Sequence, residues 1–232
     1  MLIIKFGGTV IKRLEEVVSL IKEERKIHQK ILIVTSAIGR YPDPYATDTL
    51  STYAQNLNQE TSAQIVSCGE IISGIILVNR LLAENLKAKF LSIEEMGLVF
   101  EKDLKLLKPI DFGDADIVVV PGFVALKNGK KYLLPRGGSN LTAVFLADYC
   151  KANLLIVSDT DGLYEHNPKL SQSVKLSIVS VADLIRIIIE SPRIFPIEVI
   201  KYLKRGNFVI LYRDLISKNG SLIGNFFKNS LF

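Results

Sequence analysis

Residues 134–143 read LPRGGSNLTA, and they decide the fold class of this 232-residue chain. They are expected to lead into an apolar helix that begins at Ser139 or Asn140. A buried strand at Leu154–Val157 and an acidic turn at Ser158–Gly162 come next. The two glycines lack Cβ atoms, so the backbone can approach a bound anion within hydrogen-bonding distance. The helix that follows directs its free N–H groups and the positive end of its dipole at the same anion.

A second glycine pair, Gly7-Gly8, follows the apolar N-terminal run in the same way. Beside the first pair, Gly137-Gly138, lies Arg136, whose guanidinium can hold a carboxylate through two parallel hydrogen bonds. Two anion-binding loops in one chain favour a phosphoryl-transfer enzyme that acts on a small anionic substrate. We expect the two loops to converge on one shared cavity.

The apolar runs alternate between short β-branched segments and segments with helical spacing. The short runs are typical of strands buried on both faces of a sheet. These strands are expected at Leu2–Phe6, Ile31–Thr35, Ile117–Pro121, Leu154–Val157 and Phe208–Tyr212. Helices are expected at Leu14–Ile21, Ile65–Asn85, Val181–Ile189 and Ile197–Leu203. The order predicts an α/β fold, a three-layer αβα sandwich with a mainly parallel central sheet.

Turn signals divide the chain further. Asn128-Gly129 predicts a hairpin between two apolar runs, and Asn219-Gly220 indicates another. The loop Gly39–Thr47 contains two prolines and is expected to be mobile. A soft boundary near residue 150 would divide one domain, residues 1–232, into a substrate lobe, 1–150, and a nucleotide lobe, 151–232.

Composition narrows the class of protein. Hydrophobic residues make up 48% of the chain and charged residues 23%, as in ordinary globular proteins. The net charge of +5 comes from scattered lysines and arginines, and tryptophan is absent, so no nucleic-acid partner is expected. The stretch Ile71–Leu82 is broken by polar residues and is shorter than the about 20 apolar residues that span a bilayer. No membrane partner and no signal peptide are expected.

The cysteines and histidines narrow the class of protein further. Cys68 and Cys150 lie far apart in apolar surroundings, which indicates reduced thiols in a cytoplasmic protein. With only His28 and His166 in the chain, histidine-based catalysis and a zinc site are not expected. No residue set for a resident metal is predicted, and a metal would be a hard cation that arrives with phosphate.

Six short segments occur in the order and near the spacing of a known family. They are Lys5–Thr9, Thr35–Gly39, Thr47–Asp48, Ser67–Glu70, Arg136–Ser139 and Asp159–Tyr164. They extend over nearly the whole chain, and ordered motifs are more specific than any one glycine pair. On these segments the chain resembles the catalytic domain of aspartokinases, within the amino acid kinase family. The resemblance implies transfer of the γ-phosphoryl group of Mg²⁺-ATP to the side-chain carboxylate of aspartate, by a homodimer.

The resemblance also implies a nucleotide site. Lys5 would direct its ammonium at the β- and γ-phosphates, unless it is an ordinary exposed strand lysine. The implied nucleotide-binding residues are Lys5, Gly7, Gly8, Ser36, Gly39, Gly137, Gly138, Ser158, Asp159, Asp161, Tyr164 and Arg193. For Asp161 the alternative is a plain Asp-Gly turn that serves only the backbone, and Tyr164 could equally belong to the core.

The implied amino-acid site contains an acid and a base. Glu70 lies within an otherwise apolar helix, where an unpaired carboxylate is costly. By resemblance it pairs with the α-ammonium of the substrate, while Arg136 takes a carboxylate. The alternative is a structural ion pair of Glu70 with Arg136 or a lysine. Thr47 and Ser139 complete the implied substrate-binding set, although Thr47 could instead cap the helix that begins there.

Four positions depart from the family pattern. Asn140 stands where aspartokinases carry an aspartate, and with Lys5 it is assigned to catalysis. A carboxylate nucleophile is already ionised at neutral pH and needs no general base, so residue 140 would orient charged groups rather than abstract a proton. The other departures are Val10, Asn167 and Arg193.

The leading hypothesis is therefore an ATP-dependent kinase with Mg²⁺ that acts on an amino-acid carboxylate, with aspartate as the expected acceptor. The departures motivate a second hypothesis, a non-catalytic protein that binds or senses an amino acid or nucleotide on the same fold. A third is a kinase for another small anion, such as carbamate, glutamate or a phosphonate.

Overall fold

A computed structural model describes residues 1–165, 173–190, 194–217 and 219–225. Its centre is an eight-stranded sheet with the order β12-β14-β13-β9-β1-β2-β6-β3. The strands are β1 (Leu2–Phe6), β2 (Ile31–Thr35), β3 (Ala88–Phe90), β6 (Ile117–Pro121), β9 (Asn153–Val157), β12 (Ile178–Ser180), β13 (Ile210–Arg213) and β14 (Ser221–Gly224). Every neighbouring pair is parallel except β13 and β14. The mainly parallel sheet predicted from the sequence is therefore confirmed.

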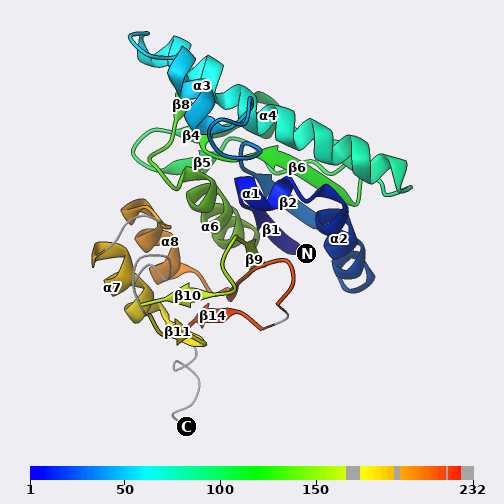
Figure 1. Ribbon diagram of the computed structural model, residues 1–232, viewed down its shortest axis with the longest axis vertical. Helices are drawn as coiled ribbons and strands as arrows, with labels where there is room; N and C mark the ends of the chain where they lie inside the picture. Colours follow the sequence, from blue (N-terminus) through cyan, green and yellow to red (C-terminus); the bar gives the residue numbers. More distant parts are fainter. Residues whose placement is uncertain (166–172, 191–193, 218, 226–232) are drawn as a thin grey trace.

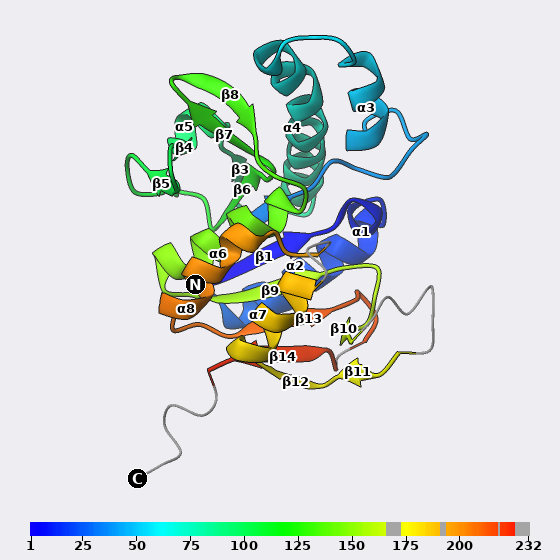
Figure 2. The same cartoon turned by 90° about the vertical axis from the view of Figure 1, so that its left-hand side faces the viewer.

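Helices cover both faces of this sheet, because successive strand residues point to opposite sides. Along β1, Ile3 joins one buried cluster and Ile4 joins the other. One face is covered by α2 (Leu14–Ile27) and α4 (Gln59–Ala83), and the other by α6 (Gly138–Cys150), α7 (Val181–Glu190) and α8 (Ile200–Arg205). Figure 1 shows α2 and α6 on opposite sides of β1, and Figure 2 shows α6, α7 and α8 in front of the sheet. The three-layer αβα sandwich is thus confirmed.

Smaller elements surround this frame. They are α1 (Gly8–Ile11), α3 (Thr47–Tyr53), α5 (Ile93–Met96), the 3₁₀ turn η1 (Ile197–Val199), β10 (Leu163–Tyr164) and β11 (Lys175–Leu176). A second sheet has the order β5-β4-β7-β8, with β4 (Leu98–Phe100), β5 (Leu104–Leu106), β7 (Val124–Lys127) and β8 (Lys130–Leu133). Asn128-Gly129 forms the hairpin turn between β7 and β8, as predicted, and residues 214–220 connect the antiparallel pair β13 and β14. Both cysteines are free thiols.

Helix α4 is longer than the sequence pattern indicated. It begins at Gln59 because the Asn58 side chain caps it, accepting a hydrogen bond from the Thr61 amide at 2.9 Å. Over its 25 residues it is the one helix of the described chain that is long and apolar enough to cross a membrane. This corrects the expectation that its apolar stretch is too short. The finding is weak, because a core helix passes the same test, and α4 packs on the central sheet through Leu77 and Leu81.

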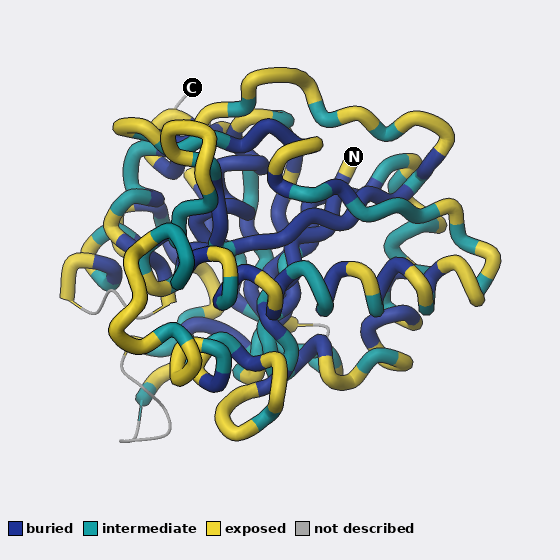
Figure 3. The backbone as a smooth tube through the Cα atoms, turned by 90° about the horizontal axis from the view of Figure 1, so that it is seen from above, coloured by how far each residue is buried: buried dark blue, intermediate teal, exposed yellow. Residues whose placement is uncertain are grey.

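The carboxyl ends of the parallel strands lie at one edge of the sheet. The register aligns the last residues of β2, β6, β9 and β13 with that of β1, Phe6. Figure 3 shows buried backbone at the centre of the molecule, surrounded by half-buried and exposed segments. Because β1 pairs directly with β9, the two proposed lobes share one sheet, and their division into substrate and nucleotide parts stays a prediction.

Candidate active site

A cavity of about 850 Å³ opens at this carboxyl edge, within the size range of small-molecule sites. Gly8 and Gly138 both line it, which confirms that the two glycine loops converge. Most of the predicted site residues line the same cavity: Lys5, Gly8, Ser36, Gly39, Thr47, Glu70, Arg136, Gly137, Gly138, Ser139, Asn140, Ser158, Asp159 and Tyr164. Gly7 and Asp161 do not, and Arg193 and Asn167 lie outside the described residues.

Lys5 is held at the cavity by β1, where it precedes the last strand residue. The side chain is half-buried, so it is not an ordinary exposed strand lysine. Burial lowers the pKa of its ammonium to about 8, against the opposing attraction of Asp159 and Glu70. The ammonium is therefore still mostly charged at neutral pH, close to two acids and inside the cavity. Such a group can neutralise an anion that enters.

Glu70 contributes a buried carboxylate from α4, with only 1% of the residue exposed. Its Oε1 accepts a hydrogen bond from the Ala37 amide at 3.2 Å, and its Oε2 has no hydrogen bond within 3.5 Å, although the Thr47 hydroxyl lies close enough to act on the carboxyl group. Burial raises the pKa of Glu70 to about 8, although the Ala37 hydrogen bond and the charge of Lys5 act against the rise. No described residue lies within ion-pair distance of Glu70, and of the structural pairs considered as alternatives only an attraction to the nearby Lys5 is found. Glu70 is therefore mostly protonated at neutral pH in the empty cavity, and a cationic group that enters beside Oε2 would favour the ionised carboxylate.

In the first glycine loop, only Gly8 lies so close to neighbouring backbone atoms that a Cβ would not fit. A Cβ on Gly8 would lie 2.4 Å from the Ala37 carbonyl oxygen, whereas one on Gly7 would make only an ordinary contact, 3.5 Å from the Val157 oxygen. The Gly39 amide donates to the Gly8 carbonyl at 2.8 Å. Gly8 thus lets two loops meet at the cavity, and Gly7 instead donates its amide to Val157.

The second glycine loop starts α6. Gly137 is the N-cap with φ +84°, a left-handed conformation that favours glycine. The helix begins at Gly138, earlier than the expected start at Ser139 or Asn140. A Cβ on Gly138 would lie 2.7 Å from the Leu134 Cβ, so only glycine fits there. The Asn140 amide donates to the Gly137 carbonyl at 2.9 Å, so the amides at this helix start without an acceptor in the helix are those of Gly138 and Ser139, which line the cavity.

Asn140 connects α6 to the segment that precedes η1. Its Nδ2 donates to the Ile194 carbonyl at 2.6 Å, and its Oδ1 is buried without a partner. Thr47 also lines the cavity, as the first residue of α3, where Ala46 is the N-cap and no side chain caps the helix. The alternative that Thr47 serves as a cap is therefore not found. Arg136 lies exposed in the lining.

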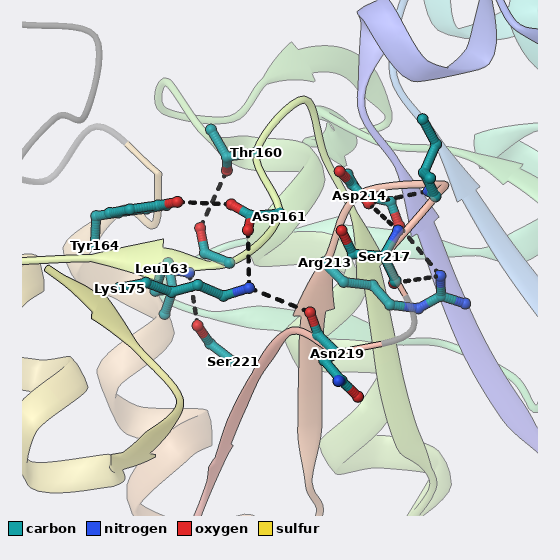
Figure 4. A network of polar contacts seen from close by, with 12 residues as sticks. Thr160, Asp161, Leu163, Tyr164, Lys175, Arg213, Asp214, Ser217, Asn219 and Ser221 are labelled. Atoms are coloured by element: carbon teal, nitrogen blue, oxygen red, sulfur yellow. Dashed lines mark hydrogen bonds and ion pairs between the residues drawn. The ribbon is translucent and has the colours of Figure 1, made fainter.

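Asp161, which the resemblance assigns to the nucleotide, contacts two neighbouring side chains (Figure 4). Its Oδ1 accepts from the Tyr164 hydroxyl at 2.7 Å, and its Oδ2 accepts from the Lys175 ammonium at 2.9 Å. The antiparallel pairing of β10 with β11 brings Lys175 opposite Tyr164. Asp161 therefore fixes the Tyr164 hydroxyl instead of lining the cavity. The Asp-Gly turn alternative is also incomplete, because Asp161 binds these side chains.

Several lining residues were not predicted from the sequence. Phe123 follows β6 with φ +60°, a rare conformation for a bulky residue. Arg40 follows Gly39 in the loop after β2, and that position was its only signal. An apolar wall also lines the cavity, made of Leu184, Ile187, Ile188, Ile194 and Phe195. On the sequence alone this wall cannot be told from ordinary core, because both show helical apolar spacing.

The charged lining combines the cations Lys5, Arg40 and Arg136 with several carboxylates. In the part of the chain that the structure describes, no group of three or more His, Cys, Asp or Glu side chains is placed to hold a metal ion. The arrangement can hold an anion between the two glycine loops, and a cationic group at Glu70.

Comparisons with known proteins place this geometry in context. The model of the amino acid kinase family matches residues 1–212. Aspartokinase 1 of Bacillus subtilis (strain 168) is 27% identical over 239 residues, which cover 94% of this chain and 59% of the relative. The aspartate kinase from Synechocystis has a TM-score of 0.82 at 22% identity, covering 97% of this chain and 40% of that one. E. coli aspartokinase III in complex with aspartate and ADP has a TM-score of 0.79 at 16% identity, covering 99% and 65%. The chain spans less than two thirds of the length of each.

Proposed function

The chain belongs to the amino acid kinase family, and from this premise we propose that it is an ATP-dependent kinase that phosphorylates the side-chain carboxylate of aspartate. The observation that carries the proposal is the meeting of Lys5, Gly8 and the α6 N-terminus in one cavity with the unpartnered Oε2 of Glu70. The relatives named above are aspartokinases, and one was solved with aspartate and ADP. Homodimer formation and a cytoplasmic location are proposed with this function.

The phosphoryl group would be held by charge and position rather than by covalent catalysis. A carboxylate oxygen of aspartate forms a bond to the γ-phosphorus, the bond from that phosphorus to the bridging oxygen breaks, and ADP leaves with the electron pair. Lys5 and the first amides of α6 would stabilise the negative charge that shifts during transfer. The carboxylate is already ionised, so no residue has to remove a proton.

Mg²⁺ would accompany ATP and neutralise phosphate charge. The described residues offer no cage of their own for the ion, which fits a cation held chiefly by phosphate oxygens. A Cβ at Gly8 or Gly138 would clash with neighbouring protein atoms, so these glycines permit the close packing of the loops that line the cavity together with Lys5. The apolar wall of α7 and the segment before η1 would hold the base of the nucleotide.

The acceptor end of the cavity is polar, and its charged groups restrict which substrates could bind there. Glu70 would hold the α-ammonium through Oε2, and Arg136 would hold a carboxylate in a bidentate pair. Thr47 and Ser139 line the same cavity. A zwitterionic amino acid satisfies both charges, whereas an acceptor without an ammonium leaves Oε2 unpaired.

Hydroxylamine trapping tests the proposed reaction. The protein is incubated with ATP, Mg²⁺, hydroxylamine and aspartate, and the hydroxamate formed from the acyl phosphate is measured. We expect hydroxamate with aspartate and none when ATP is omitted. If neither aspartate nor any other amino-acid carboxylate yields hydroxamate, the kinase proposal is wrong.

Asn140 favours a second candidate, a protein that binds ATP and aspartate without turnover. Its amide nitrogen is already committed to the Ile194 carbonyl, and an amide supplies no negative charge. Calorimetry with aspartate and with ATP distinguishes the candidates. Binding of both ligands without hydroxamate would support the non-catalytic protein.

Two ionisable groups in the cavity lining, Glu70 and Lys5, predict a bell-shaped pH profile of kcat/KM. In the empty cavity the pKa values of Glu70 and Lys5 both lie at about 8. Below this pH Glu70 becomes protonated and loses its charge for the ammonium, and above it Lys5 loses the proton that makes it cationic. We therefore expect a maximum near pH 8, with the two groups titrating as a coupled pair.

The rates for this profile are measured by detection of ADP. Hydroxylamine trapping is unsuitable here, because hydroxylamine itself changes its protonation state with pH. Glu70→Gln should remove the acid limb and leave the alkaline limb. A profile that is flat between about pH 6 and pH 10 would contradict the assignment of these pKa values to the site.

A further inference from the structure

Two loops flank the end of β1, and an ion pair joins them across it. Residues 36–46 follow β2 and residues 158–162 follow β9, and β1 lies between these strands in the sheet. The Arg40 Nη2 donates to the Asp159 Oδ2 at 2.9 Å, and both side chains line the cavity. The pair therefore lies over the end of the strand that carries Lys5 and leads into Gly8.

The backbone of Arg40 is anchored to the first glycine loop. The preceding amide, of Gly39, donates to the Gly8 carbonyl at 2.8 Å. The Arg40 amide donates to the Asp43 carboxylate at 3.0 Å, and that carboxylate pairs with Lys12 at 2.9 Å. These bonds fix the start of the loop against the segment that contains α1.

The Arg40 side chain, in contrast, is 62% exposed. An ion pair between exposed side chains contributes little to stability. The guanidinium can therefore leave Asp159 at small cost while its backbone stays at Gly8. The Arg40 side chain can thus move while its backbone stays fixed beside the proposed phosphate-binding loops.

We propose that Arg40 exchanges Asp159 for the phosphates of the bound nucleotide, so that the Arg40–Asp159 pair is the resting state of a phosphate-binding arginine. This inference rests on the proposed kinase function. Phosphates near Lys5 and Gly8 would bring more negative charge to the guanidinium than one carboxylate does. Its planar fork also fits phosphate oxygens with two parallel bonds. Asp159 then affects nucleotide binding indirectly, because it holds Arg40 when no nucleotide is bound.

The competing explanation is a structural brace between the two loops, and the two explanations predict different sizes of effect. If Asp159 competes with phosphate for Arg40, Asp159→Asn should weaken nucleotide binding much less than Arg40→Met does, because it frees Arg40 while removing one attraction that favours the charged form of Lys5. If the pair is only a brace, removing either partner should weaken binding to a similar extent.

Calorimetry with a non-hydrolysable ATP analogue and Mg²⁺ tests this, with adenosine as a ligand without phosphate. Arg40→Met is expected to weaken binding of the analogue by about 10–100-fold and to leave adenosine binding unchanged. Arg186→Met removes the same charge from an exposed pair on α7, Arg186 with Asp183, outside the cavity lining, and should bind both ligands like the unmodified protein.

The outcomes separate the inference from the function. Unmodified protein that binds no analogue and makes no hydroxamate overturns both. Unmodified protein that binds the analogue overturns only the inference if Arg40→Met binds it equally well, or if Arg40→Met and Asp159→Asn weaken it equally. Circular dichroism of each variant establishes that the fold is retained.

Discussion

Replacing Lys5 with methionine is expected to lower kcat by about 10²–10³-fold, the effect of removing one preorganised group that stabilises transition-state charge. Methionine keeps the length and apolar stem of lysine but carries no charge. The fold should persist, because burial already disfavours the ammonium, whose pKa is lowered to about 8. KM for aspartate should change little, since the lost charge would act on the phosphoryl group. Steady-state release of ADP measures both constants.

A matched control separates this effect from a general loss of positive charge. Lys26→Met makes the same substitution on the exposed side of α2, where Lys26 pairs, among the residues that the structure describes, only with a neighbour on its own helix, Glu23, at 2.7 Å. We expect kcat of this variant to equal that of the unmodified protein. A Lys5→Met protein that keeps more than about a tenth of kcat would exclude Lys5 from transition-state stabilisation.

Replacing Glu70 with glutamine is expected to raise KM for aspartate by about 10²-fold, because an ammonium would then enter a buried site that has lost its counter-charge. Glutamine is nearly isosteric and its side-chain oxygen can still accept the Ala37 amide, which now donates to Oε1. KM for ATP should stay within about twofold. The measurement is a matrix of initial rates against both substrates.

Succinate sharpens the experiment, because it carries both carboxylates of aspartate but no ammonium. The kcat/KM ratio of aspartate over succinate should fall in Glu70→Gln, whereas general damage to the site would lower both values together. Glu60→Gln, at the start of the same helix and paired with Lys130 on the surface, is the control and should keep the ratio. An unchanged ratio in Glu70→Gln would show that Glu70 does not hold the ammonium.

The site could be predicted from sequence where it follows from strand order. Gly8, Ser36 and Ser158 come soon after three apolar runs that were expected to be parallel strands, and parallel strands end at one edge. Their side chains and backbone therefore meet although they are distant in sequence. Glu70 was recognised for a related reason, since a carboxylate in an apolar helix needs a partner.

Other features of the site depend on atoms far away in sequence. Asp161 is directed to Tyr164 and Lys175 by the pairing of two short strands that no periodic pattern announces. Gly7 falls outside the lining because its amide meets the carbonyl of Val157 in β9. The length of α4 followed from a single capping contact at Asn58.

The sequence by itself determined the layers of this protein and its parallel sheet, because the spacing of apolar residues acts within a few positions. It also determined the two glycine turns, because the lack of a Cβ acts at the residue itself. Only the tertiary structure decided which groups share the cavity, which acid stays without a partner and which arginine crosses the end of β1. Those outcomes depend on distances between strands and on burial, because desolvation and hydrogen bonding act between neighbours in space and not along the chain.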